Sequence, residues 1–172
     1  MPIPFANGLG MDLNSLSKSR DRGKTVEKKL NVPAKKEELV SLRDGDYVYL
    51  TGTIYTVEKG ESLPIDVKDN LIYYLGPTPA RPGTVIGSAG PTTASRMDKY
   101  TPTLLDMGMA GMIGKGKRNQ AVLDACVRNK SVYFAAVGGA GALLSKCIKE
   151  SEVVSYDDLG TEAIRKLTVE NL

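Results

Sequence analysis

The chain has 172 residues, of which 41% are apolar and 25% are charged, and these proportions favour one globular domain over a disordered chain. Its net charge is only +3, but the basic excess lies in residues 1–43, which hold nine Lys and Arg against five Asp and Glu. The sequence has no histidine, which excludes Ser-His-Asp and Cys-His catalysis and histidine-ligated metals, and its two cysteines are too few for an iron–sulfur cluster or a disulfide framework.

No segment has the composition of a membrane anchor. No apolar run approaches the length of about 18 residues that a transmembrane helix needs, and residues 1–14 lack the basic start and long apolar stretch of a signal peptide. We therefore expect a cytoplasmic protein in which Cys126 and Cys147 stay reduced. Nucleic-acid binding is the least favoured function, because Phe5 is the one aromatic residue in the basic segment that could stack on a base.

The first half of the chain is rich in strand signals. Residues 1–33 are polar and are expected to form a basic, extended or loosely ordered arm, and residues 34–172 the folded domain. Pro33 suits the start of a short helix at residues 34–39. Aromatic and β-branched residues then predict strands at residues 47–56, 71–75 and 84–86.

From about residue 100 onward, helix and strand signals alternate. The predicted helices cover residues 101–109, 119–129, 138–149 and 159–167. The predicted strands cover residues 111–114, 131–137 and 153–154. This alternation predicts an α/β domain with a mixed sheet, for which a β/β/α sandwich is one arrangement.

Three glycine-rich turns follow predicted strands, at residues 87–96, 114–117 and 138–141. In open α/β sheets ligands gather at the carboxyl ends of strands, and glycine lets backbone N–H groups approach an anion closely. Two of the turns carry a cation, Arg96 and Lys115. A forked guanidinium beside an ammonium group is a good receptor for a small dicarboxylate. The alternative is that these glycines only serve turns and that the two cations are solvated.

The one motif that resembles a dinucleotide-binding fingerprint is incomplete. Residues 139–144 read G-A-G-A-L-L, so Leu144 stands where a dinucleotide fingerprint has its third glycine.

The hydroxyls of Thr92 and Thr93 are candidate proton-transfer groups, because these residues precede Arg96 by four and three residues. A hydroxyl becomes a useful base only when nearby cations or N–H groups lower its pKa, or when it relays a proton. The alternative is that both threonines cap a turn.

Five stretches of the sequence are similar, in order, to one enzyme family. Residues 90–98 read G-P-T-T-A-S-R-M-D, which resembles the G-P-T-T-x-x-R-M signature of iron–sulfur-dependent (class I) fumarate hydratases and L-tartrate dehydratases, in their β subunit or C-terminal domain. The resemblance covers about residues 35–170, and the other matching stretches are residues 45–56, 73–79, 111–116 and 138–143.

The resemblance implies a fold, a reaction and a partner. The fold is a swivelling β/β/α three-layer domain with a mixed sheet, and the reaction is the reversible hydration of fumarate to L-malate. The partner is an α subunit whose cysteines hold a [4Fe–4S] cluster, and the resulting heterodimer is expected to form a homo-oligomer. An L-tartrate dehydratase β subunit is the alternative within the same family.

The resemblance also assigns roles to residues of the signature. Thr92 is implied as the base at the carbon that loses a proton. Arg96 is implied to clamp a carboxylate and to lower the pKa of Thr92, and Lys115 to bind the second carboxylate or its developing charge. Gly90 and Thr93 are implied as further substrate-binding positions.

The sequence departs from the family after the first strand. There the family reads T-A-R-D-x-x-H, whereas Thr56 is followed here by Val57 and Glu58, so that Glu58 stands in place of the arginine. Either the arginine–histidine segment is deleted from the protein, or the protein has this active-site loop and the sequence lacks it. The chain also stops at Leu172, where the family continues into one more strand. A non-catalytic interaction protein that has lost this segment is therefore a second hypothesis.

Overall fold

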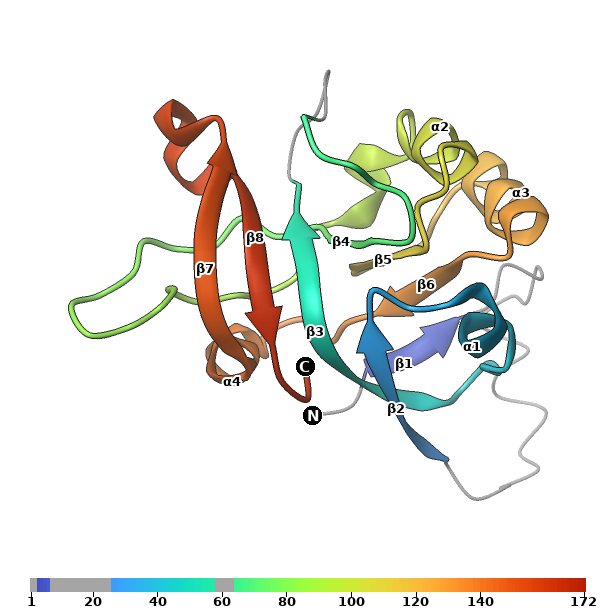
Figure 1. Cartoon of the computed structure of the whole chain (residues 1–172), viewed down its shortest axis with the longest axis horizontal. Helices are drawn as coiled ribbons and strands as arrows, with labels where there is room; N and C mark the ends of the chain where they lie inside the picture. The colour runs from blue at the N-terminus through green and yellow to red at the C-terminus, as the bar shows by residue number, and fades with distance from the viewer. Residues whose placement is uncertain (1–2, 7–25, 58–63) are drawn as a thin grey trace.

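One mixed sheet, which curves back on itself, organises the molecule (Figure 1). The computed structural model describes residues 3–6, 26–57 and 64–172. The strands are β1 (Ile3–Ala6), β2 (Glu27–Val32), β3 (Tyr47–Thr56), β4 (Leu71–Tyr73), β5 (Gly111–Gly114), β6 (Val132–Ala135), β7 (Ile148–Ser155) and β8 (Ile164–Val169). The α-helices are α1 (Lys36–Val40), α2 (Thr101–Asp106), α3 (Gln120–Asn129) and α4 (Gly141–Cys147), and two 3-10 helices are η1 (Ala94–Met97) and η2 (Asp157–Glu162).

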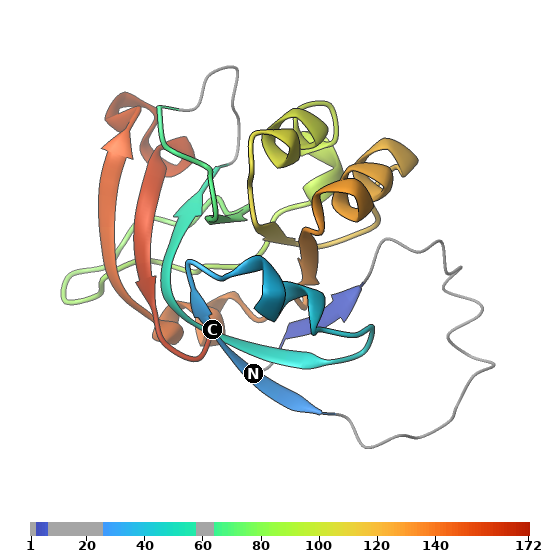
Figure 2. The same cartoon turned by 45° about the vertical axis from the view of Figure 1, so that its right-hand side comes forward.

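The long strand β3 connects the parts of this sheet. It pairs in parallel with β2 and β4 and antiparallel with β1 and β8. The parallel order continues from β4 through β5 to β6, and β1 pairs with both β6 and β3. The pairings β3–β4–β5–β6–β1 therefore close a ring, with β8 and β7 extending from β3 (Figures 1 and 2).

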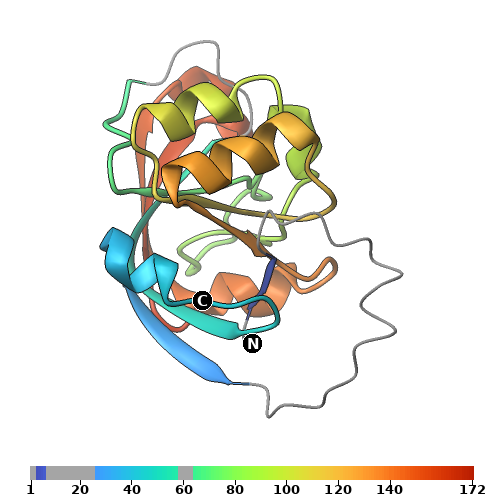
Figure 3. The same ribbon diagram turned by 90° about the vertical axis from the view of Figure 1, so that its right-hand side faces the viewer.

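Alternate side chains of the central strands enter two separate cores, as the pleat of a strand requires. One core lies beneath α2 and α3, which run side by side over the sheet in Figure 3, and includes Ile72, Tyr74, Leu105, Met112, Val122 and Cys126. The other lies between the central strands β4, β5 and β6 on one side and the strands β3 and β8 on the other. It includes Leu50, Ile54, Leu71, Tyr73, Phe134 and Leu167. The molecule therefore has a helix layer and two strand layers, which agrees with the expected α/β fold.

Most predicted elements are confirmed, with shifts of a few residues at their ends. The strands at residues 47–56 and 111–114 have the predicted bounds, and α3 buries Val122, Ala125 and Cys126 on the predicted face. The predicted helix at residues 138–149 is α4, which ends at Cys147, and the expected strand at residues 153–154 is the longer β7. Among the described residues, no helix has the length and apolar composition needed to cross a membrane.

Two predicted elements are wrong. Residues 84–86 form no strand, because the backbone turns just before them: the Thr84 amide donates to the Arg81 carbonyl at 3.0 Å, and the Arg81 amide donates to the Thr84 hydroxyl at 2.9 Å. The predicted helix at residues 159–167 is instead η2 followed by the strand β8. The apolar spacing of Ile164 and Leu167 fits a helical turn, but β8 gains backbone partners on both sides, from β3 and β7.

Parts of the expected N-terminal arm belong to the sheet. Residues 3–6 form β1 and residues 27–32 form β2, where the sequence predicted only extended or loosely ordered chain. Residues 7–25 of this segment lie outside the described residues, and the boundary at residue 33 stays a prediction.

Candidate functional site

The glycine-rich turns meet at one edge of the sheet. Because β4, β5 and β6 are parallel, their carboxyl ends lie at the same edge, and the segments that follow them contain the three turns. These are residues 87–96 after β4, residues 114–117 at the end of β5 and residues 138–141 after β6. Short backbone contacts then join the turns to one another.

Backbone hydrogen bonds join the first two turns. The Lys115 amide donates to the Thr92 carbonyl at 3.3 Å, and the Ala94 amide donates to the Lys115 carbonyl at 2.9 Å. The Thr92 amide in turn donates to the Tyr74 carbonyl at 2.9 Å, directly after β4. This close approach requires a glycine at position 114, since a Cβ there would lie 2.9 Å from the Ala94 Cβ. Thr92 and Lys115, distant in sequence, are therefore neighbours.

The third turn packs on the start of the first. The Ala89 amide donates to the Gly141 carbonyl at 3.0 Å, and the Tyr73 hydroxyl donates to the Ala89 carbonyl at 2.7 Å. A Cβ at position 141 would overlap the Ser88 side chain and lie 2.8 Å from the Gly90 amide nitrogen. Glycine at position 141 thus lets the two turns touch.

The residues that the sequence singled out lie in the segments that form this junction. Arg96 is exposed in η1 and Lys115 is half-buried at the end of β5, and neither cationic group has a hydrogen bond or ion pair with the described residues. Thr92 is half-buried and its hydroxyl donates to the Tyr74 carbonyl at 3.0 Å, while Thr93 is exposed and Gly90 half-buried beside it. The segments of the junction therefore carry two cations and one fixed hydroxyl, which are residue types suited to binding an anion.

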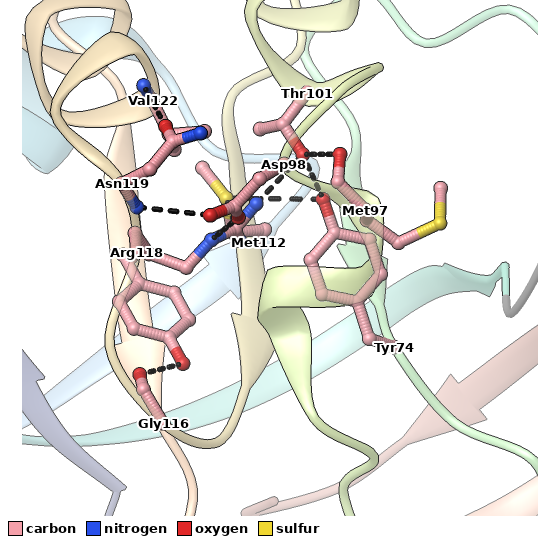
Figure 4. A network of polar contacts seen from close by, with 10 residues as sticks. Tyr74, Met97, Asp98, Thr101, Met112, Gly116, Arg118, Asn119 and Val122 are labelled. Atoms are coloured by element: carbon pink, nitrogen blue, oxygen red, sulfur yellow. Dashed lines mark hydrogen bonds and ion pairs between the residues drawn. The ribbon is translucent and has the colours of Figure 1, made fainter.

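Sequence reasoning missed a buried arginine behind these turns. Only 1% of the Arg118 side chain is exposed, and it forms an ion pair with Asp98 at 2.6 Å (Figure 4). Its other guanidinium nitrogens donate to the Thr101 hydroxyl at 2.7 Å and the Met112 sulfur at 2.9 Å. Nothing in the spacing around Arg118 distinguishes it from the solvated Lys117 beside it, because its burial depends on contacts between distant segments.

The guanidinium of Arg118 also lies against two tyrosine rings. Its central carbon is 5.2 Å from the Tyr74 ring centre and 5.4 Å from that of Tyr133. Burial raises the pKa of both tyrosine hydroxyls, and the charge of Arg118 opposes this shift only in part. Both hydroxyls therefore stay protonated, and that of Tyr133 donates to the Gly116 carbonyl at 2.9 Å.

The described residues do not fit an iron–sulfur cluster. Cys126 is buried on α3, and Cys147 is partly exposed at the end of α4, so the two thiols belong to different helices. Within residues 3–6, 26–57 and 64–172, no three His, Cys, Asp or Glu side chains are grouped as a metal site. Glu58, where the sequence departs from the family, lies outside the described residues.

Comparison with known proteins assigns the chain to a family. The model of the family described as "Fumarase C-terminus" matches residues 10–172. The chain belongs to this family. The "Fumarate hydratase class I, aerobic" of Salmonella typhimurium is 44% identical to it over 117 residues, which cover 67% of this chain and 20% of that protein.

Two further relatives cover more of the chain. The "Fumarate hydratase class I, anaerobic" of Escherichia coli is 38% identical over 165 residues, which cover 87% of this chain and 30% of that protein. The "L(+)-tartrate dehydratase subunit beta" of Escherichia coli is 29% identical over 147 residues, which cover 78% of this chain and 73% of that protein. The chain thus spans only 20% and 30% of these two fumarate hydratases, but most of the tartrate dehydratase subunit.

Proposed function

We propose that this chain is the β subunit of a [4Fe–4S]-dependent hydro-lyase that hydrates fumarate reversibly to L-malate. Membership of the Fumarase C-terminus family and the similarity to two fumarate hydratases support this class of reaction. The observation that carries the proposal is the junction of two turns, where backbone hydrogen bonds join Thr92 to Lys115 and η1 holds Arg96 close by in the chain.

Each residue of the junction has a role in this proposal. Arg96 binds one substrate carboxylate with its planar fork, and Lys115 binds the other as a point charge. Thr92 takes the proton from the carbon that loses it, and the nearby positive charge favours its ionised hydroxyl. Gly90 and Thr93 line the same turn. The negative charge that develops on the carboxylate is then stabilised by two cations that need no other partner among the described residues.

The cluster and the remaining ligands are assigned to a partner. Since the described residues do not fit a cluster, we place it on an α subunit, where it supplies Lewis-acid chemistry to the substrate. The similarity to a protein named as a β subunit supports such a partner, and the heterodimer is proposed to form a homo-oligomer in the cytoplasm. The two free thiols suit that reducing compartment.

L-tartrate is the second candidate substrate. One observation supports it: the chain is also similar to a protein named "L(+)-tartrate dehydratase subunit beta". Sequence identity favours fumarate, because the two fumarate hydratases are 44% and 38% identical to the chain and the tartrate dehydratase subunit of Escherichia coli is 29% identical.

An anaerobic assay with both substrates tests the proposal. The purified chain is assayed alone and together with an α subunit encoded beside its gene, and iron content and visible absorption confirm that the cluster is intact. We expect no cluster on the chain alone, and turnover only in the mixture, faster with fumarate than with L-tartrate. Faster turnover of L-tartrate would mean that L-tartrate, and not fumarate, is the substrate. A loaded mixture that turns over neither compound would instead support the non-catalytic interaction protein.

A further inference from the structure

The ion pair between Arg118 and Asp98 links the two segments that carry the proposed substrate cations. Asp98 directly follows η1, the short helix that contains Arg96, and caps its end. Arg118 follows Lys115 by three residues, just before α3. The ion pair, at 2.6 Å, therefore joins the ends of the two segments whose starts are joined by the Thr92–Lys115 backbone bonds (Figure 4).

Both partners of the ion pair make additional contacts that fix the same two segments. The second carboxylate oxygen of Asp98 accepts from the Asn119 amide at 2.9 Å, and the Thr101 hydroxyl donates to the Met97 carbonyl at 2.7 Å while accepting from Arg118. The Tyr133 hydroxyl, on a ring that stacks against Arg118, holds the Gly116 carbonyl beside Lys115. A buried arginine without these partners would be strongly unfavourable, so the network forms or fails as a unit.

We infer that Arg118 and Asp98 are positioning residues, which set the separation of the Arg96 guanidinium and the Lys115 ammonium without touching the substrate. This inference rests on the proposed function, since it concerns the two cations that bind the dicarboxylate there. The separation of the cations decides which spacing of two carboxylates fits between them. A displacement of about 1 Å in a positioned group can lower a rate about 10²-fold, so the network acts on turnover from a distance.

The test compares variants of this network with a matched ion pair elsewhere. Arg118→Lys keeps the charge but has one nitrogen in place of the three that reach Asp98, Thr101 and Met112 separately. Asp98→Asn keeps the shape but removes the charge. The control is Arg128→Lys with Asp106→Asn, since Arg128 and Asp106 form a two-pronged exposed pair at 2.7 and 2.8 Å between α2 and α3. All variants are assayed as the complex with the α subunit.

We expect each network variant to lower kcat about tenfold or more, and the double variant to be no slower than the slower single variant. The control variants should stay within about twofold of the parent complex. A second readout is independent of how much protein is folded: the inhibition constants of malonate, succinate and glutarate. Their ratios should change in the network variants, because the cations move, and should not change in the controls.

Tyr133→Phe keeps the test decisive if the arginine variant does not fold. It removes only the hydroxyl that holds the Gly116 carbonyl and leaves the ring against Arg118, so it should fold and still shift the inhibitor ratios. Unchanged kcat and unchanged ratios in variants that are merely less heat-stable would overturn the inference while leaving the proposed function intact. A parent complex that is inactive on both fumarate and L-tartrate would overturn the proposed function, and this inference with it.

Discussion

Single residues of the site differ in what holds them. Thr92 is fixed by three hydrogen bonds, two through its backbone and one from its hydroxyl to the Tyr74 carbonyl at 3.0 Å. The charged ends of Arg96 and Lys115 have no hydrogen bond or ion pair among the described residues, although backbone bonds hold Thr92 and Lys115 together. Substitutions at Arg96 should therefore affect a ligand much more than the fold.

Arg96→Lys separates ligand binding from stability. Lysine keeps the charge but loses the planar contact to a carboxylate, so we expect kcat of the assembled enzyme to fall about 10²- to 10³-fold. The thermal midpoint of the chain should move little, since an exposed substitution changes the free energy of unfolding by less than about 0.5 kcal/mol. Thr92→Ala should lower kcat to a similar extent. It should also lower the free energy of unfolding by about 1 kcal/mol, because the hydrogen bond of its hydroxyl is lost. Near-normal turnover in either variant would mean that the substituted residue is not part of the active site.

The two thiols should react at very different rates. Burial raises the pKa of Cys126 to about 11, and the positive charge of Arg118 opposes this shift only in part. At pH 8 about one thousandth of this thiol is ionised, so a thiol reagent should modify only Cys147 in the folded chain and both thiols in denaturant. The variant Cys147→Ser isolates the slow site. Rapid labelling of that folded variant would mean that the core beneath α3 opens readily.

The sequence predicted Thr92, Arg96 and Lys115 as site residues, but it did not predict the buried network behind them. Thr92, Arg96 and Lys115 lie in short glycine-containing motifs that can be recognised locally, and the structure brings Thr92 and Lys115 into contact. Arg118 needs Asp98, Thr101 and two tyrosines from three other segments to be buried. No local sequence pattern predicts such a set of partners. The roles of Thr92, Arg96 and Lys115 stay predictions.

At the scale of elements, pairing partners outweigh local preference. The strand β3 was predicted with its observed bounds because eight of its ten residues are aromatic or β-branched, which suits a strand. The strand β8 was predicted as a helix because its apolar spacing fits both structures. Its backbone bonds to β3 and β7 decide the outcome, and β3 is distant from it in sequence.

Gly141→Ala tests whether close contact of the turns matters. The added Cβ would overlap the Ser88 side chain and press on the Gly90 amide, so the first and third turns must separate. We expect a loss of about 1–3 kcal/mol in the free energy of unfolding, typical of overpacking, together with lower turnover. Gly138→Ala is the control, because its Cβ would meet only the Lys115 side chain, at an ordinary 3.9 Å. Equal behaviour of the two variants in chemical denaturation would show that the contact is dispensable.

At the scale of the whole molecule, the proposed site lies at only one of the two edges formed by the ends of the parallel strands. The turns with Thr92, Arg96 and Lys115 occupy the edge where the parallel strands end. Val137 and Leu143 flank the third turn and are 45% and 54% exposed, which places apolar surface beside the proposed substrate site. The helix α3 leads from this edge, at Asn119, to the opposite one, where Val127 is also 54% exposed. A partner that completes the site must cover the first edge.

Leu143→Asp should weaken binding to the α subunit, and Val127→Asp should not. Both residues are helical and equally exposed, so neither substitution should disturb the core, but only Leu143 lies in the first turn of α4 beside the site. Stable subunit interfaces commonly bury about 2,000 Å² or more around a dry apolar centre, in which a buried carboxylate is strongly unfavourable. We expect a dissociation constant raised about tenfold or more for Leu143→Asp in equilibrium binding, with the thermal midpoint of the isolated chain preserved. Equal affinity of both variants would place the interface elsewhere on the molecule, and weaker binding by Val127→Asp alone would place it over α3.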